Sequence, residues 1–274
     1  MTTATNTSST SFATSADGTQ IAYEVTGTGP ALVLVDGAMC LRGLGPSRGL
    51  ATALADRFTV YAYDRRGRGE SGAGSTPYDP QREVEDLVAV IRAAGGSAHV
   101  LGVSSGAALA LEAARQGVAI DRLAIYEAPF IVDESHRPND PELPEQVQAL
   151  VEAGRRGDAV RIFLRTVGVP APFLVLMRFM PAWKQMTGTA HTLPYDLRIV
   201  VPRQQGRPLP DGCYDAVGAD TLVVAGGKSP AYMRNAQAAV AAAVPNARLV
   251  TLPGQTHMVK PKVLAPVLAE FLLT

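Results

Sequence analysis

The chain has 274 residues, 47% of them hydrophobic and 18% charged, which suits one soluble α/β domain with an insertion. Its 25 basic and 25 acidic residues cancel and no basic cluster stands out, which argues against nucleic acid or an anionic membrane as a partner. Two distant cysteines do not make a disulfide framework and fit a reducing cytoplasm. No run of about 18 apolar residues predicts a membrane span, and residues 1–10, rich in Thr and Ser, predict a flexible tail rather than a signal peptide.

The first part of the chain alternates between short apolar runs and amphipathic stretches. Asp17-Gly18 predicts a hairpin between two strands, and the continuous apolar run 31–35 is typical of a strand buried on both faces. The further elements that we expect here are a helix at about 44–57, a strand at 59–63, a glycine-rich loop at 64–72 and a helix at 80–94.

The stretch 98–111 predicts a strand, a sharp turn and a helix, with Ser104 at the apex of the turn. Its centre is Gly102-Val-Ser-Ser-Gly106. A larger residue at 102 or 106 would collide with the neighbouring strand or helix, which explains the two glycines. The G-x-S-x-G pattern alone is a weak signal, but its place between a strand and a small-residue helix favours an exposed nucleophile.

After the next strand, 122–126, the alternation stops. Residues 131–215 carry prolines, helical pieces and an apolar patch, and they predict a helical insertion over the main sheet. Alternation returns with strands at 221–225 and 248–252 and helices at 231–244 and 260–273. We therefore expect a core of residues 11–130 and 216–274, with a mostly parallel twisted sheet and helices on both faces.

Several candidate site residues lie just past the ends of predicted strands. Ligands bind beyond the carboxyl ends of the strands in such sheets, so these positions are expected to gather on one rim. They are Ala38-Met39, Ser104, Glu127, Ser229 and His257.

With these motifs in place, the chain resembles the α/β-hydrolase superfamily over about residues 18–274. The marks are the Ser104 turn, Tyr63-Asp-Arg-Arg-Gly-Arg-Gly-Glu-Ser71, Val33-Leu-Val-Asp-Gly-Ala38 and Gly254-Gln-Thr-His257. The resemblance implies a Ser–acid–His triad and a helical cap inserted after the sixth strand, where residues 131–215 lie. It does not name a substrate.

Ser104 is the predicted nucleophile and His257 the predicted base. A serine hydroxyl is a poor nucleophile unless a base takes its proton. His257 is the one histidine of four that follows the last predicted strand in a Gly-x-x-His turn. The alternative for His257 is a loop residue with a single structural hydrogen bond. His99 is expected to be structural, and His136 and His191, within the insertion, to be solvent-exposed or in contact with substrate.

The oxyanion hole needs two amides that face the developing charge. Ser105 N–H follows the nucleophile, and the loop after Val35 is expected to supply Ala38 N–H, with Met39 as the second choice. The family more often has His-Gly where this chain has Asp36-Gly37, and we expect Asp36 to hold the loop. Met39 and Met258, next to these site residues, are predicted to contact substrate.

The acid of the triad is where the sequence departs from the family pattern. Ser229 stands where an aspartate usually follows the seventh strand, and a neutral hydroxyl does not offset the charge of an imidazolium. We predict that Glu127, after the strand next to the Ser104 turn, supplies the carboxylate, as in certain haloalkane dehalogenases. The alternative for Glu127 is a solvated residue ahead of the insertion, since Glu is mostly exposed.

Two further groups are predicted to have no catalytic part. Asp64-Arg-Arg-Gly-Arg-Gly does not open a helix after the first strand, so it favours a structural loop over a phosphate site. No His/Cys/Asp set has metal-ligand spacing, so we expect no metal and no cofactor. Cys40 lacks a basic partner and is expected to line the pocket as a small apolar group.

The apolar patch of the insertion is expected to form mostly the core of the cap, above a largely apolar pocket. It comprises Phe173, Leu174, Leu176, Met177, Phe179, Met180 and Trp183. These features predict a cytoplasmic serine hydrolase, a monomer or homodimer, that cleaves a small carboxylic ester, lactone or thioester with an apolar acyl part. Two alternatives remain open: a lyase, cyclase or cofactor-less haloperoxidase-like enzyme on the same triad, or a ligand-binding protein with a vestigial triad. Epoxide hydrolase and dehalogenase activities are disfavoured, because both need a carboxylate at the position that Ser104 occupies.

Overall fold

A computed structural model describes residues 9–74 and 77–274, and its centre is one eight-stranded sheet. The expected flexible tail, residues 1–10, lies mostly outside the described residues; of its last two, Thr10 donates a hydrogen bond from Oγ1 to Glu70 Oε2 over 2.9 Å. The strands are β1 (Ser11–Thr14), β2 (Gln20–Thr26), β3 (Ala31–Val35), β4 (Thr59–Tyr63), β5 (Ala98–Val103), β6 (Ile120–Tyr126), β7 (Asp220–Gly226) and β8 (Ala247–Leu252).

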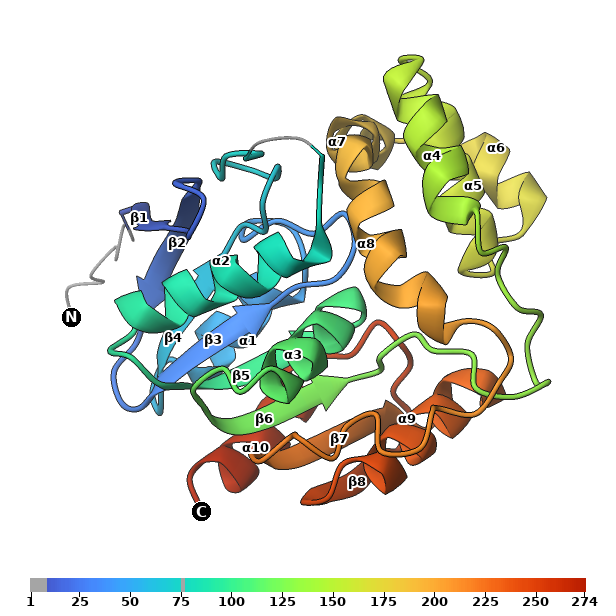
Figure 1. The fold of residues 1–274 in the computed structure, drawn as a ribbon. Helices are drawn as coiled ribbons and strands as arrows, with labels where there is room; N and C mark the ends of the chain where they lie inside the picture. Colours follow the sequence, from blue (N-terminus) through green and yellow to red (C-terminus); the bar gives the residue numbers. More distant parts are fainter. Residues whose placement is uncertain (1–8, 75–76) are drawn as a thin grey trace.

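The helices connect these strands and cover both faces of the sheet (Figure 1). The core helices are α1 (Pro46–Leu54), α2 (Pro80–Ala93), α3 (Ser105–Arg115), α9 (Ala231–Ala243) and α10 (Pro261–Leu272). Between β6 and β7 lie α4 (Leu143–Glu152), α5 (Arg156–Thr166), α6 (Ala171–Met177), α7 (Pro181–Thr189) and α8 (Leu193–Val200), with the short 3₁₀ turns η1 (Ala190–Thr192) and η2 (Val201–Arg203).

The strand order is β1-β2-β4-β3-β5-β6-β7-β8, antiparallel for β1–β2 and β2–β4 and parallel from β4 to β8. The predicted fold class, a mostly parallel sheet with helices on both faces, is confirmed. The order in which successive strands are added to the sheet reverses direction between β3 and β5, which pair through Val35 and Gly102. A switch point of this kind opens a crevice at the carboxyl ends of the two strands, and the Ser104 turn begins there.

The apolar run 31–35 is buried on both faces, as its pattern predicts. Val33 and Val35 belong to the hydrophobic cluster that includes α2, α3, α9 and the inserted helices, whereas Leu32 and Leu34 belong to the cluster with α1 and α10. Alternate side chains of a strand point to opposite faces, so a strand between two helical layers needs apolar residues at every position.

The inserted helices follow β6 and extend away from the sheet on one side (Figure 1). The prediction that the apolar patch 173–183 forms mainly a helical core is wrong for four of its seven residues. Leu174 is buried and Met177 and Trp183 are partly buried, but the exposed fractions are 61% for Phe173, 60% for Leu176, 83% for Phe179 and 50% for Met180. The reason is local: α6 has only seven residues and packs mainly against α5, and Phe179 and Met180 lie in the short link between α6 and α7.

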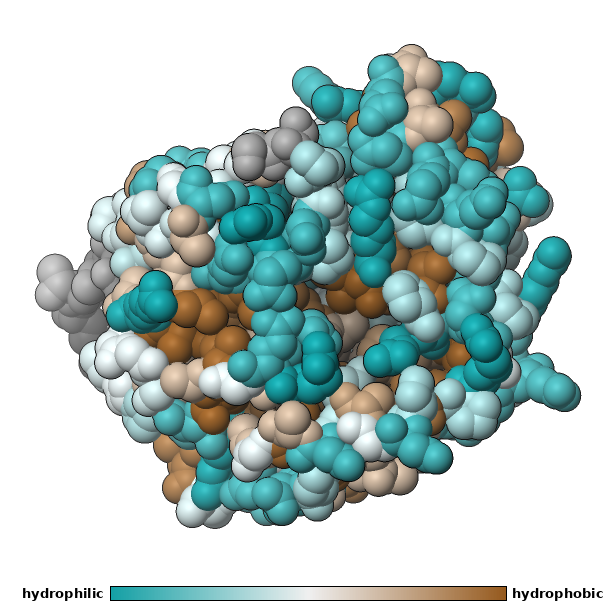
Figure 2. Space-filling model, viewed as in Figure 1, coloured by the Kyte–Doolittle hydropathy of each residue, from teal (hydrophilic) through white to brown (hydrophobic). Residues whose placement is uncertain are grey.

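Hydrophilic residues cover most of the face shown in Figure 2, and hydrophobic residues are visible in hollows between them. Within residues 9–74 and 77–274, no helix has both the length and the hydropathy required to cross a bilayer.

Candidate active site

Ser104 lies on the tight turn between β5 and α3, in a backbone conformation that residues other than glycine seldom adopt. Its φ is 57° and its ψ is −124°. A Cβ on Gly102 would lie 2.5 Å from Gly106 O, and a Cβ on Gly106 would lie 2.1 Å from Val35 O. The predicted collisions at both glycines are therefore confirmed, and they explain how the turn fits between β3 and α3.

The structure brings Ser104, His257 and Glu127 together, although they come from three distant parts of the chain. His257 Nε2 is 3.1 Å from Ser104 Oγ, and His257 Nδ1 is 2.9 Å from Glu127 Oε2. A carboxylate at Nδ1 favours the tautomer with the proton on Nδ1, which leaves Nε2 free to accept the serine proton. This is the relative placement that the three roles require.

Glu127 is fully buried and held at both of its oxygens. Oε1 accepts a 2.7 Å hydrogen bond from the Gly226 amide, and Oε2 contacts His257. The Glu127 φ of 49° places a non-glycine residue in the left-handed region, which is uncommon and is tolerated where the surroundings fix it. The alternative of a solvated residue is wrong, because the side chain has no exposed surface.

Ser229 lies on the turn after β7, beside the same Gly226. Its side chain is 2% exposed, and its Oγ has no hydrogen-bond partner among the described residues. A Cβ added to Gly226 would be 2.8 Å from Ser229 Oγ, so this hydroxyl is close to the amide that holds Glu127. The hydroxyl at the usual acid position does not reach His257; the carboxylate from β6 does.

The last residue of β6, Tyr126, fixes the backbone on both sides of the Ser104–His257 pair. Its carbonyl accepts a 2.9 Å hydrogen bond from Ser104 N, and its hydroxyl donates to Thr256 O over 2.6 Å. The Lys228 amide also donates to Gln255 O over 2.8 Å, which ties the His257 loop to the turn after β7. His257 therefore has a supported backbone, while its side chain remains 36% exposed on the side open to a substrate.

The loop after β3 approaches Ser104 closely enough to supply an oxyanion donor. A Cβ on Gly37 would lie 2.9 Å from Ser104 Cβ and 3.4 Å from Ser104 Oγ, so only glycine fits beside the nucleophile. Ala38 and Ser105 line the same cavity as Ser104. Asp36 is 2% exposed, its Oδ2 has no partner among the described residues, and burial raises its pKa to about 7, although Ser47 and the charge of Arg68 act in the opposite direction.

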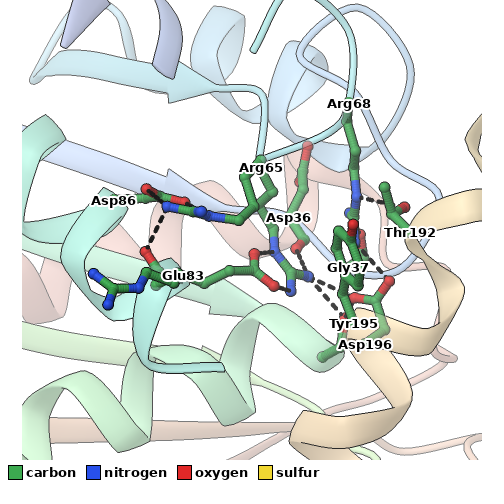
Figure 3. Close-up of polar contacts among 12 residues, drawn as sticks. Asp36, Gly37, Arg65, Arg68, Glu83, Asp86, Thr192, Tyr195 and Asp196 are labelled. Carbon is green, nitrogen blue, oxygen red and sulfur yellow. Dashed lines mark hydrogen bonds and ion pairs between the residues drawn. The ribbon is translucent and has the colours of Figure 1, made fainter. Parts of the chain in front are cut away.

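The arginine-rich loop 64–72 is structural, as its sequence predicts. Arg65 forms ion pairs with Glu83 and Asp196 over 2.6 Å each, and Arg68 pairs with the other oxygen of Asp196 over 2.6 Å. Figure 3 shows how these side chains meet around Asp36 and Gly37. These buried charges have specific partners, which is the condition under which buried charge is tolerated.

Beside Ser104 lies a cavity of about 140 Å³, lined by both core and inserted helices. Its apolar lining includes Ile131, Phe163, Val167, Leu197, Val200 and Met233. His136 also lines it, whereas His191 contacts Gly67 O over 2.7 Å and His99 packs edge-on against Phe58.

Three of the predicted pocket residues do not line this cavity. Met258 is 84% exposed, and Met39 packs against the hydrophobic cluster. Cys40, expected in the pocket, lies instead next to Gly45, and burial raises the pKa of its thiol to about 12, so it stays protonated near neutral pH. In residues 9–74 and 77–274, no group of three or more His, Cys, Asp or Glu side chains is placed to hold a metal ion.

The lining of the cavity includes a carboxylate that the motif analysis did not identify, Asp196 of α8. It is 1% exposed and accepts a 2.7 Å hydrogen bond from Ser105 Oγ in addition to its two arginines. Burial by itself would raise the pKa of Asp196, but the charges of Arg68 and Arg65 and the bond from Ser105 hold it below its usual value. A signal existed: Leu193 and Val200, three residues before and four after, put this carboxylate on an apolar helix face.

Comparison with known proteins places this arrangement in a family. Residues 38–266 match the model of the alpha/beta hydrolase family. The crystal structure of an alpha/beta hydrolase from Sphaerobacter thermophilus is 45% identical, with a TM-score of 0.86, over 96% of this chain and 100% of that chain. The enol-lactonase from Burkholderia xenovorans is 19% identical, with a TM-score of 0.71, over 96% of this chain and 100% of that chain, a likeness of fold alone.

A curated relative, N-formylmaleamate deformylase from Pseudomonas putida, is 34% identical over 146 residues, or 51% of this chain. The match covers 53% of that protein, so the chain spans about half the length of this relative. The family match covers most of the chain and includes the Ser104 turn, the inserted helices and His257. The chain belongs to the alpha/beta hydrolase family.

Proposed function

We propose that the protein hydrolyses a small carboxylic ester, lactone or thioester with an apolar acyl part, through an acyl-enzyme on Ser104. His257 acts as the base, Glu127 as the acid that orients it, and the amides of Ala38 and Ser105 as the oxyanion hole. The observation that carries the proposal is the continuous line from Ser104 Oγ through His257 to a fully buried carboxylate, with distances of 3.1 and 2.9 Å.

The chemistry follows from these positions in two halves. His257 Nε2 takes the Ser104 proton as the oxygen attacks the carbonyl carbon, and the carbonyl oxygen becomes an oxyanion facing the two amides. The imidazolium then donates its proton to the leaving alcohol or thiol, and the acyl-enzyme remains. His257 then takes a proton from water as the water oxygen attacks the acyl carbon, and it returns that proton to Ser104 Oγ as the bond to the acyl group breaks and the acid leaves.

Glu127 matters because an imidazolium forms in both halves. A buried carboxylate at Nδ1 stabilises that positive charge and keeps the ring oriented. Gly226 N–H fixes the other carboxylate oxygen, so the ring faces a group that does not need to move.

The substrate class is inferred from the size and lining of the cavity. A volume of about 140 Å³ with aliphatic and aromatic side chains favours a short apolar acyl group over a long chain. The deformylase named above acts on an N-formyl compound, which makes a formyl amide a useful member of a substrate panel.

The test is a panel of p-nitrophenyl esters of increasing acyl length, lactones and N-formyl amides, measured with wild type and Ser104→Ala. We expect turnover of short esters or lactones that is abolished in Ser104→Ala, together with fluorophosphonate labelling that requires both Ser104 and His257. Folded wild-type protein that neither turns over the panel nor labels would contradict the proposal and favour a ligand-binding role. Turnover of an ester that persists in Ser104→Ala would exclude the acyl-enzyme.

A further inference from the structure

We propose that Asp196, on inserted helix α8, and Arg68, on the loop after β4, are positioning residues that set the orientation of the oxyanion-hole amides; this inference rests on the proposed function. Four side chains with 2% exposure or less carry it: Arg65, Arg68, Ser105 and Asp196. None of them is a predicted acid, base or nucleophile. Figure 3 shows three of them, Arg65, Arg68 and Asp196, around the Asp36-Gly37 turn.

The first step concerns the Gly37–Ala38 peptide. Arg68 Nη1 donates a 2.7 Å hydrogen bond to Gly37 O. In a trans peptide the C=O of one residue and the N–H of the next point in opposite directions. Since Arg68 fixes the carbonyl on one side, the Ala38 N–H points to the other side of the peptide. Gly37, which begins this peptide, lies next to the nucleophile, since a Cβ on it would be 2.9 Å from Ser104 Cβ.

The second step concerns the preceding peptide. Arg65 Nη1 donates to Asp36 O over 3.2 Å, so two successive carbonyls of this loop point toward arginines. A flip of the Gly37–Ala38 peptide would turn its carbonyl toward the developing oxyanion. It would also leave a buried guanidinium N–H without its acceptor, which costs free energy because Arg68 is 2% exposed.

The third step is the role of Asp196, which links the inserted helix to both oxyanion residues. Its Oδ2 accepts from Arg68 Nη2 over 2.6 Å, and its Oδ1 accepts from Arg65 Nη1 over 2.6 Å and Ser105 Oγ over 2.7 Å. Arg68 thus uses one nitrogen for Asp196 and the other for Gly37 O. Because the guanidinium of Arg68 is planar and rigid, the position of the Asp196 carboxylate also fixes the position of the Gly37 carbonyl.

Two consequences follow. The inserted helices take part in the reaction through α8, because Asp196 holds the arginines that orient the Asp36 and Gly37 carbonyls. A variant without this carboxylate should also bind ground-state ligands normally and lose affinity for the tetrahedral state alone, since an oxyanion hole contributes mainly in the transition state.

The experiment compares Asp196→Asn and Arg68→Met with wild type on the best ester of the panel. We expect kcat to fall about 10²-fold with KM within about threefold, as for loss of an oxyanion donor. The inhibition constant of a trifluoromethyl ketone with the same acyl group, which forms a tetrahedral adduct, should rise in parallel with the loss of kcat/KM. The inhibition constant of an unreactive ether analogue of the ester, which has no carbonyl oxygen, should stay nearly constant.

A matched control separates positioning from general stability. Asp86 forms a similar buried pair with Arg66, at 2.6 and 2.7 Å, but neither residue touches the carbonyls of Asp36 or Gly37. Asp86→Asn should lower Tm as Asp196→Asn does, yet keep kcat and the inhibition constant of the ketone within about twofold. Equal losses of kcat in the two variants would overturn the proposal.

Ser105→Ala provides a milder variant in case Asp196→Asn does not fold. It removes one bond to Asp196 and leaves the Ser105 amide, so we expect kcat about fivefold lower with KM unchanged. Wild-type activity in Ser105→Ala, Arg68→Met and Asp196→Asn would overturn this inference while the proposed function stands. Absence of Ser104-dependent turnover in wild type would overturn the proposed function and this inference with it.

Discussion

The turns that follow β6 and β7 lie side by side at the rim of the sheet. Each buries a polar side chain, but the two side chains differ in their hydrogen-bond partners. Glu127 after β6 is fully buried, and both of its carboxylate oxygens have partners. Ser229 after β7 is almost as buried, and its hydroxyl has none among the described residues. The comparison teaches that the usual position of an acid is less informative than whether a side chain there reaches the histidine with a charge.

The largest effect is expected when the carboxylate after β6 is neutralised. In Glu127→Gln the amide still accepts from Gly226 N, but its NH₂ group faces His257 Nδ1 and favours the wrong tautomer. We expect kcat to fall by about 10⁴-fold, as for the equivalent change in a serine protease, with little change in Tm. The measurement is kcat on the best ester of the panel.

Its control is Glu152→Gln, an exposed glutamate of α4, which should match wild type. Near-wild-type kcat in Glu127→Gln would remove this residue from the triad.

Asp36 is a second buried carboxylate near Ser104, and its Oδ2 has no hydrogen-bond partner among the described residues. Burial raises the pKa of Asp36 to about 7, above its value in the unfolded chain, so the protonated form is favoured in the native state. The unfolded chain loses this proton near pH 4 and the native state near pH 7, so stability falls as the pH rises through that window. We expect the free energy of unfolding of wild type to fall by about 3 kcal/mol more than that of Asp36→Asn between about pH 5 and pH 8.

Urea unfolding at several pH values checks this difference. Parallel pH profiles for wild type and Asp36→Asn would show that Asp36 does not titrate in this range.

The β7 side can be given a charge of its own in Glu127→Gln/Ser229→Asp. Ser229 lies beside Gly226, so a carboxylate at 229 approaches the same amide and the same imidazole as Glu127. We expect the double variant to regain about tenfold in kcat over Glu127→Gln, because a charge near the imidazolium is restored without the optimal geometry. The steady-state kcat of the two variants is compared, and Ser229→Asn in the same background is the neutral control. Equal activity of the Asp and Asn versions would show that the turn after β7 no longer faces the histidine.

The smallest expected effect is that of Ser229→Ala on the free energy of unfolding. Ser229→Ala removes a buried hydroxyl that has no hydrogen-bond partner in residues 9–74 and 77–274. We therefore expect the free energy of unfolding to rise by about 1 kcal/mol and kcat to stay within about twofold. Urea denaturation and the ester assay measure the two quantities. A tenfold loss of kcat would instead assign Ser229 a part in catalysis that its contacts do not indicate.

The sequence by itself determined the fold class, the turn that carries Ser104 and the order of the elements. These features depend on local patterns: an apolar run at every position of β3, glycines at 102 and 106, and a histidine after the last strand. It also indicated Glu127, which follows the strand next to the Ser104 turn, as the carboxylate that Ser229 does not supply.

The partners of Asp196 and the exposure of Phe179 and Met258 depend on how distant segments pack, so they could be learned only from the folded chain. Asp196 lies 91 residues from Ser105 in the chain, and nothing near it in sequence indicates that its carboxylate meets two arginines and that hydroxyl. The exposure of Phe179 and the position of Met258 outside the cavity were equally unreadable, since an apolar residue looks the same in sequence whether or not a neighbouring element covers it. Local chemistry is written in short stretches of sequence, whereas the partner of a buried charge is set by the arrangement of the whole chain.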